Sequence, residues 1–177
     1  MESAIVALVC IALIVVGGMT LSQGFLSSLD TSSVGLEEMS QRAEERMRTE
    51  VEPLSATQPS PDEVEVSLHN SGQTKLGDFD SWDVILQYYD GNGTCRVVWL
   101  PYTEGAPGDN QWTDEGIYLD AAGGTPEAFE PGILNPGEEM VIELRVDPPV
   151  GEDTVNLTVV TTPNGISTSL SFAGYAP

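Results

Sequence analysis

The sequence predicts an α+β protein, in which a long N-terminal hydrophobic α-helix is followed by an immunoglobulin-like antiparallel β-sandwich head. Two observations predict this fold class. An uncharged run covers residues 3–29, and about 20 apolar residues are enough to cross a bilayer as a helix. After Asp62 the chain changes to short alternating segments separated by turn residues, which is typical of a two-sheet sandwich.

The N-terminal segment is predicted to be a polymerisation helix. Residues 4–16 are apolar on every side, as expected of a helix that meets lipid or other copies of itself. Gly17 and Gly18 are predicted to form a hinge, because paired glycines lower helix propensity and let a neighbouring backbone approach. The side chains predicted to form the polymerisation core are Ala4, Ile5, Val6, Leu8, Val9, Ile11, Leu13, Ile14, Val15, Val16, Leu21, Phe25, Leu26 and Leu29.

The helix is expected to become amphipathic after residue 29, where apolar residues recur three or four positions apart. A Ser/Pro-rich stretch begins near Pro53 and predicts the end of the helix and a linker. The predicted domains are therefore the polymerisation helix over residues 1–52, the linker over 53–62 and the β-sandwich head over 63–177.

Seven strands are expected in the head. The first alternates apolar Val64, Val66 and Leu68 with polar residues. Turn residues in 90–93 and 164–165 predict two hairpins. The other six strands are predicted over 83–89, 94–102, 111–119, 139–146, 154–161 and 166–172, and the Gly-, Pro- and acid-rich segments 103–110 and 121–132 are expected to be surface loops.

The charge balance limits the possible partners. With 28 acidic and 6 basic residues the net charge is -22, so nucleic acid and anionic lipid surfaces would be repelled. A saline exterior and simple solubility both account for this charge. Cys10 and Cys95 are expected to lie far apart without a disulfide, Cys10 as an apolar packing residue and Cys95 as a buried strand residue.

The residues that could take part in catalysis or bind a metal do not predict an enzyme, a cofactor or a metal site. His69 is the single histidine and is expected to face solvent on a strand. Asp78, Asp80 and Asp83 could supply oxygen ligands to Ca²⁺, although aspartates also favour turns, which is the preferred interpretation. Residues 90–94 resemble the opening of an EF-hand loop, but its twelfth position is Pro101. No phosphate-binding loop or nucleophile motif occurs.

Two asparagines lie in N-glycosylation sequence motifs. Asn92 belongs to Asn-Gly-Thr in a predicted hairpin tip, and Asn156 belongs to Asn-Leu-Thr in a predicted strand. Both are candidate attachment sites on an exported head, and Asn156 must point outward to qualify. The sequence therefore predicts a glycoprotein, with Asn92 the stronger candidate.

The order of hydrophobic helix, amphipathic continuation and β-rich head resembles archaeal-type members of the type IV filament superfamily, the archaellins and related pilins. Within the head, the elements that look like the β-domain of archaellins and archaellum envelope proteins are Val64-Glu65-Val66, Asn70-Ser71-Gly72, Phe79, Trp82-Asp83-Val84 and Leu134-Asn135-Pro136-Gly137-Glu138. The resemblance covers most of the chain, and each of these elements by itself is a loose match.

The resemblance implies a particular route of biogenesis. A prepilin-type peptidase would remove a short basic leader on the cytoplasmic side and leave Met1 as the first mature residue, which would explain why no Lys or Arg precedes Arg42. A signal anchor with an unusual flank is the alternative. One departure concerns position 5, where many type IV pilins carry Glu and this chain has Ile5, its early acid being Glu2.

The function predicted on this basis is a structural subunit of an extracellular helical filament at the cell surface, of the archaellum motility type, with acidic heads outside and polar, salt-sensitive contacts between them. The implied partners are identical subunits, the prepilin-type peptidase, a membrane assembly platform and inner-membrane lipid before assembly. The alternatives are an adhesive archaeal type IV pilin, a membrane-anchored envelope-binding β-sandwich resembling an archaellum stator, and an anchored metal-dependent enzyme.

Overall fold

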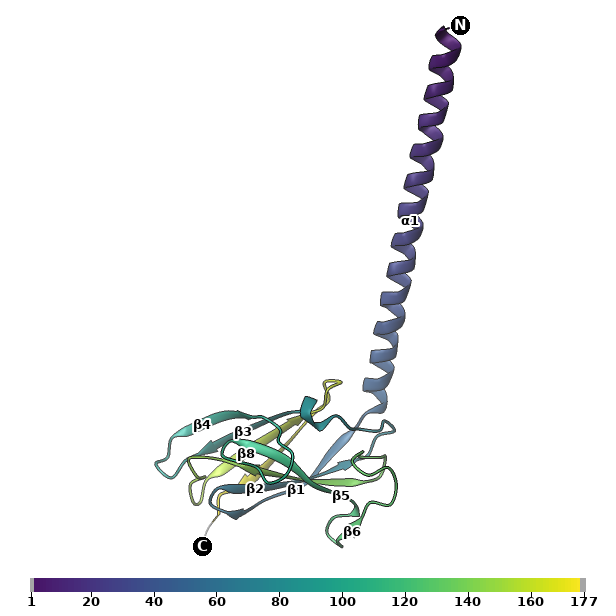
Figure 1. The fold of residues 1–177 in the computed structure, drawn as a ribbon. Coiled ribbons are helices and arrows are strands. Elements are labelled where there is room, and N and C mark those ends of the chain that lie inside the picture. Colours follow the sequence, from purple (N-terminus) through teal and green to yellow (C-terminus); the bar gives the residue numbers. More distant parts are fainter. Residues whose placement is uncertain (1, 176–177) are drawn as a thin grey trace. The chain divides into compact units, whose positions relative to one another are not determined.

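The chain forms two compact units, which span Met1–Glu44 and Glu45–Pro177 (Figure 1). This computed structural model describes the backbone of residues 2–175 and, within that range, the side chains of residues 6–20, 22–23 and 35–175. The first unit is helical and the second is a β-sandwich.

Helix α1 spans Glu2–Arg48 and continues through Gly17 and Gly18. The Thr20 hydroxyl donates a hydrogen bond of 2.9 Å to the Gly17 carbonyl within the helix. At the C-terminal end the Thr49 hydroxyl donates to the Glu45 carbonyl at 2.8 Å, which satisfies one of the carbonyls left free there. The helix therefore ends earlier than the predicted domain boundary at residue 52.

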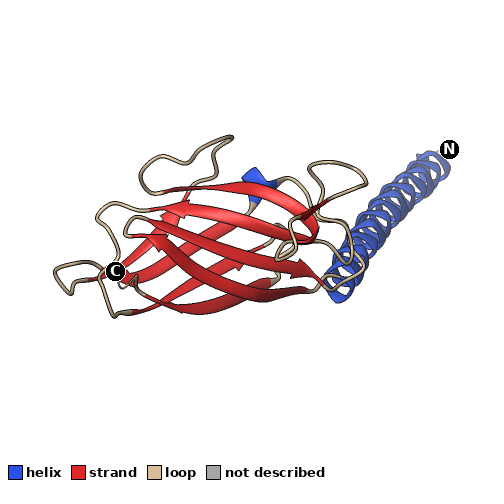
Figure 2. Ribbon diagram, turned by 90° about the horizontal axis from the view of Figure 1, so that it is seen from below, coloured by secondary structure: helices blue, strands red, loops and turns tan. Residues whose placement is uncertain are grey.

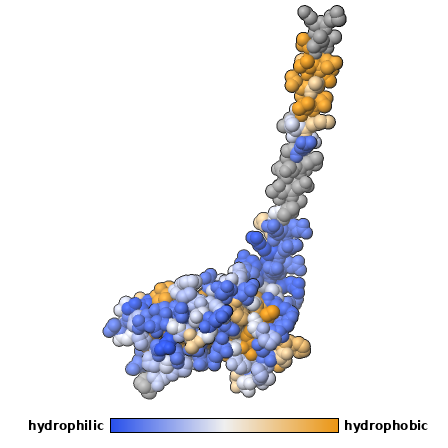
Figure 3. Space-filling model, viewed as in Figure 1, coloured by the Kyte–Doolittle hydropathy of each residue, from blue (hydrophilic) through white to orange (hydrophobic). Residues whose placement is uncertain are grey.

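The predicted fold class is wrong in its helix. Among the described side chains of α1, the closely spaced large apolar residues are confined to the stretch from Val6 to Met19 (Figure 3). Residues 6–20 span about 22 Å at about 1.5 Å per residue, and Ser22 and Gln23 then expose polar side chains. The later part of α1, residues 36–48, is exposed and mostly polar. Helix α1 is thus long, but it is not a long hydrophobic helix.

Within the residues that the structure describes, no helix combines the length and the apolar character needed to cross a membrane.

The second unit is an antiparallel β-sandwich (Figure 2). One sheet has five strands in the order β1-β2-β7-β5-β6, and the other has four in the order β4-β3-β8-β9. The strand bounds are β1 Val51–Ser60, β2 Glu63–Asn70, β3 Asp83–Tyr89, β4 Cys95–Leu100, β5 Gln111–Asp120, β6 Thr125–Pro126, β7 Glu139–Arg145, β8 Val155–Thr161 and β9 Ser167–Ala173; a short 3-10 helix, η1, covers Phe79–Ser81.

The core lies between the two sheets and follows from strict alternation along the strands. Val64, Val66 and Leu68 of β2 are at most 1% exposed, because successive strand residues point to opposite faces. Trp82 and Trp112 are the largest fully buried side chains. Aromatic side chains of this size contribute much of the buried apolar area.

The predicted linker over residues 53–62 is wrong, because most of it belongs to β1. Pro53 and Pro59 argue against a strand by propensity, but β1 lies at the edge of its sheet, where β2 is its one partner among the described strands. An edge strand tolerates proline because the missing N–H faces away from the ladder. The pairing of β1 and β2 shifts register between Pro53 and Ser55 and again between Thr57 and Ser60. The short strand β6 likewise lies inside a segment predicted to be a loop.

Candidate interaction surfaces

The β3–β4 hairpin is fixed by one buried carboxylate. Asp90 is 2% exposed. Its Oδ1 accepts hydrogen bonds from the backbone N–H groups of Asn92 at 2.9 Å and Thr94 at 3.0 Å, and its Oδ2 accepts one from Arg96 Nε at 2.8 Å. The Thr94 hydrogen bond and then the Arg96 guanidinium hold the pKa of Asp90 below its ordinary value. The hairpin thereby displays β4 in a defined position.

The outer side of the four-stranded sheet carries a group of apolar side chains, here named the apolar face. In the β3–β4 pairing Ile85 lies opposite Trp99 and Gln87 opposite Val97, and in the β3–β8 pairing Ile85 lies opposite Val159. The apolar face consists of Ile85, Tyr89, Val97, Trp99, Val155, Leu157 and Val159, and the patch at the left of the head in Figure 3 lies near β4.

The apolar face is well exposed and almost free of charge. Val97 is 68% exposed, Trp99 56% and Val155 74%. Among the outward residues of the four strands, only Asp83 is charged, and its Oδ1 accepts a hydrogen bond of 2.9 Å from Trp99 Nε1. In a chain of net charge -22, so uncharged an area is a distinct feature of the surface.

Cys95 shows why this face was missed from the sequence. It was predicted to be buried, but it is exposed, and that prediction is wrong. Leu100 is fully buried and Val98 packs against the core, so the even-numbered side chains of β4 point inward. Apolar side chains occur at both the odd-numbered and the even-numbered positions of β4, so the alternation does not tell which side is buried. A strand that is apolar on both sides was the available signal in the sequence for a second apolar surface.

The outer side of the five-stranded sheet has the opposite character. Glu65 of β2 lies directly opposite Glu143 of β7, and neither side chain is more than partly buried. Burial, followed by the nearby charges of Glu115 and Glu63, raises the pKa of Glu65 above its ordinary value. For Glu143 burial again acts first, and the same two neighbours and Glu65 raise its pKa further. We name this surface the acidic face.

One basic group, Arg145, meets the acidic face at one of its ends. Arg145 of β7 lies opposite Glu63 in the ladder. Its guanidinium contacts Asp62 at 3.0 Å and Asp109 at 3.7 Å. His69, predicted to face solvent, is partly buried on this side, opposite Glu139.

The aspartates considered for calcium are used locally. Asp78 adopts a left-handed backbone with φ of 48° at the start of η1, and Asp83 accepts the indole hydrogen bond of Trp99. Asp80 is exposed in η1. Across the described residues, no group of three His, Cys, Asp or Glu side chains is placed to hold a metal ion.

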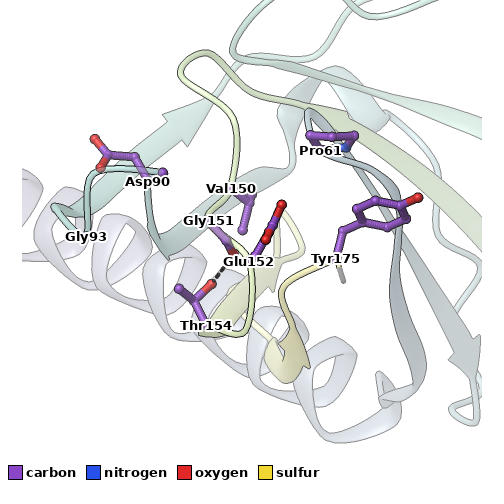
Figure 4. Close-up of a pocket in the computed structure, with 9 residues that line it drawn as sticks. Pro61, Asp90, Gly93, Val150, Gly151, Glu152, Thr154 and Tyr175 are labelled. Carbon is purple, nitrogen blue, oxygen red and sulfur yellow. Dashed lines mark hydrogen bonds between the residues drawn. The ribbon is translucent and has the colours of Figure 1, made fainter. Parts of the chain in front are cut away.

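A cavity of about 650 Å³ lies at one end of the sandwich (Figure 4). Its lining residues include Asp90, Gly151, Glu152, Thr154 and Tyr175. Most of the polar groups are already bonded within the protein: the Asp90 oxygens hold the hairpin, and the Thr154 hydroxyl donates to the Gly151 carbonyl at 2.7 Å. The backbone N–H of Tyr175 donates to the Gln58 side chain at 2.8 Å. The cavity therefore offers few unbonded polar groups with which to orient a ligand.

The two glycosylation candidates differ in access. Asn92 is exposed in the β3–β4 turn. Asn156 is 2% exposed, and its Oδ1 accepts a hydrogen bond of 3.1 Å from the Tyr89 backbone N–H. Its side chain points inward, so it lacks the outward orientation that modification of the folded chain requires. Modification at Asn92 stays a prediction.

The predicted polymerisation core is untested by a single chain. The described members, from Val6 to Val16, are exposed on α1. The side chains of Ala4, Ile5, Leu21, Phe25, Leu26 and Leu29 lie outside the described residues.

Comparison with known proteins gives a likeness of fold. No family model and no curated protein matches the chain. The archaeal flagellum of Methanospirillum hungatei strain JF1 is similar at 12% identity and a TM-score of 0.56, covering 94% of this chain and 90% of the other. The archaellum periplasmic stator protein FlaG from Sulfolobus acidocaldarius is similar at 22% identity and a TM-score of 0.50, covering 70% of this chain and 99% of the other. The complex of stator proteins FlaF and FlaG from the same organism gives 23% identity, a TM-score of 0.49, and coverage of 69% and 87%.

Proposed function

We propose that this protein is an archaellum-associated binding module outside the cytoplasm, whose β-sandwich attaches to another envelope component as a stator would. The observation that carries the proposal is the likeness to the FlaG stator protein, nearly all of which is matched by 70% of this chain. That share is close in size to the unit Glu45–Pro177, which contains the whole sandwich. We therefore take the likeness to lie mainly in the sandwich of this chain.

The surfaces of the sandwich support a binding role. A stationary component must hold its partner under load, and a contiguous exposed apolar patch of a few hundred Å² is typical of a protein interaction site. Trp99 and Val97 supply such a patch on the apolar face. The acidic face opposes contact with anionic lipid or nucleic acid. We accordingly propose a protein partner and no catalytic activity.

A second candidate is a subunit of the motility filament itself. It is favoured by the coverage of the archaeal flagellum match, 94% of this chain. The unit Glu45–Pro177 makes up about three-quarters of the residues, so that match extends into α1. In this candidate, copies of the same chain are the principal partners.

Copy number and location separate the two candidates. Filaments are sheared from native cells, and the chain is quantified by mass spectrometry in filament, membrane and soluble fractions. The stator-like proposal expects a low copy number in the envelope fraction, and expects cells lacking the gene to assemble filaments that do not drive swimming. A major band in sheared filaments, together with loss of filaments on deletion, would replace it with the filament candidate. Recovery in the cytoplasmic fraction would refute both.

A surface variant tests the binding role directly. Trp99→Lys places a charge on the apolar face and should abolish swimming while leaving the sandwich folded. Phe129→Lys is the control, because Phe129 is also strongly exposed, at 76%, but lies in a loop away from the apolar face. Equal swimming by the two variants would count against the apolar face as the attachment site.

A further inference from the structure

The turn that carries Asn92 lies directly beside the apolar face. Strand β3 ends at Tyr89 and β4 begins at Cys95, and these two residues pair across the ladder. Both are exposed on the outer side of the sheet, Tyr89 at 39%. The apolar face therefore extends up to the turn, where its aromatic side chain is that of Tyr89.

The backbone that carries both side chains is held in a defined geometry. The Gly93 N–H donates a hydrogen bond of 2.8 Å to the Asp90 carbonyl, which closes a β-turn around Asn92. The N–H of Tyr89 donates to the Asn156 side-chain oxygen at 3.1 Å. Asn92 and Tyr89 are thus attached to a rigid scaffold, which lowers the entropy lost when a group on one contacts the other.

A sugar attached to Asn92 has the space and the reach to lie on Tyr89. Tyr89 is three positions before Asn92, so their Cα atoms are at most about 11 Å apart even in an extended chain, and the turn brings them closer. An asparagine side chain with one pyranose ring can bridge this separation. At Gly91 and Gly93 a Cβ would meet no atom within 4 Å, so the attachment point is surrounded by open space.

We propose that the first sugar joined to Asn92 packs its C–H face against the ring of Tyr89, so that this end of the apolar face is a binding platform for the protein's own glycan. The proposal rests on modification of Asn92, which the sequence motif predicts. The sugar is a neutral hexose or N-acetylhexosamine, because the C–H groups of such a ring are slightly positive and the face of an aromatic ring is negative.

Attachment of the sugar requires a phosphate-activated glycan donor and a transferase of the cell. Nδ2 of Asn92 forms a bond to the anomeric carbon and loses one proton, while the bond from that carbon to the carrier phosphate breaks and the phosphate leaves with the electron pair. Asn92 and Thr94, the two defining residues of the motif, are both exposed. The acceptor amide is therefore accessible in the folded domain.

The cavity at the same end of the sandwich is the competing place for this sugar. Gly93 and Tyr175 both line it (Figure 4), and Tyr175 is 36% exposed. A pyranose carries hydroxyl groups around its ring, and enclosing them without hydrogen-bond partners is costly. The polar groups of the cavity are mostly bonded within the protein, whereas on the open apolar face the hydroxyls stay in water. These observations favour Tyr89.

A sugar on Tyr89 leaves the far end of the apolar face open. Trp99 lies four residues along β4 from Cys95, the partner of Tyr89 in the ladder. This separation is about 13 Å at about 3.3 Å per residue, more than one sugar ring covers. The glycan and a protein partner bound at Trp99 can therefore occupy the two ends of the same face.

The test compares the full chain from its native cells with the same chain from a bacterial host that attaches no N-glycans, both in neutral detergent. The glycan is expected to raise the melting temperature of the sandwich by about 2–4 °C, and Tyr89→Val should remove this gain. Tyr175→Val is the matched control, since it removes the same ring at a similar exposure beside the cavity, and it should keep the gain. Each variant is compared with its own unmodified form, so effects of the substitution on folding cancel.

Nuclear magnetic resonance of the modified chain locates the sugar independently of stability. The ring current of Tyr89 should shift protons of the first sugar upfield relative to the same glycan on an unfolded peptide, and Tyr89→Val should abolish the shift. An unmodified Asn92 in the native chain, or a gain in melting temperature that survives Tyr89→Val, would overturn the proposal. So would a gain lost in Tyr175→Val alone, which would place the sugar in the cavity.

Discussion

Glu143→Gln is expected to stabilise the sandwich at neutral pH. Glu143 and Glu65 lie directly opposite one another on neighbouring antiparallel strands, and like charges in such pairs are destabilising by up to about 1 kcal/mol. Both side chains retain some access to solvent, so screening limits the gain to about 0.5–1 kcal/mol. For a domain of this size the melting temperature should rise by about 2–4 °C.

The pH dependence of this gain follows from the raised pKa values. The pKa of Glu143 is raised in the folded protein, so the folded state binds the proton more tightly than the unfolded state does. The charged group therefore costs stability, and the cost grows as pH rises from the ordinary glutamate value through the folded pKa. The benefit of Glu143→Gln should be complete at neutral pH and should vanish below the ordinary pKa, where both states of the wild type are protonated.

Near-UV circular dichroism of the buried tryptophans Trp82 and Trp112 reports the unfolding of the sandwich. Melting curves are compared at pH 7 and about pH 3.5, each at low and high salt. Glu104→Gln is the control, because it removes the same charge from an exposed loop residue. The reasoning is refuted if the two variants melt alike at pH 7, or if the gain from Glu143→Gln persists at the acidic pH.

Three further predictions concern local structure. Asp90→Ala should speed amide hydrogen exchange throughout the β3–β4 turn, because it removes the acceptor of two backbone N–H groups and of a guanidinium; unchanged exchange would contradict the role assigned to Asp90. Gly72→Ala should lower the free energy of unfolding by about 1–3 kcal/mol, because a Cβ there would overlap the backbone that follows α1, whereas Gly77→Ala meets no atom within 4 Å and should melt like the wild type. Glycopeptide mass spectrometry of the native protein should find modification at Asn92 and none at Asn156; a glycan on Asn156 would show that modification precedes folding.

Much of the sandwich could be predicted because its strands obey the simplest local rule. Val64, Val66 and Leu68 alternate with polar residues, and the observed strand buries the predicted side. The turn at residues 90–93 joins β3 and β4 as expected. In each case the information lies within a few adjacent residues, because side-chain alternation and turn geometry are local properties.

The errors occurred where a distant part of the chain decides the outcome. Strand β1 was predicted to be a linker because Pro53 and Pro59 cannot donate backbone hydrogen bonds within a sheet. At the edge of the sheet those hydrogen bonds are not needed, so the strand tolerates both prolines. Cys95 was assigned to the wrong side of β4 because both sides of that strand are apolar. Which side faces the core depends on how the second sheet packs, and this information is not present in the strand itself.

The apolar face also changes what salt should do to contacts between heads. Polar contacts, as predicted from the acidic composition, would weaken as ionic strength rises. Contacts through Val97 and Trp99 contain almost no charge, while the remainder of each head carries a large excess of acid. Salt would then screen the repulsion between copies and leave the apolar contact intact. Self-association that tightens with salt is therefore expected for contact through the apolar face, and association that loosens indicates contact through groups of opposite charge.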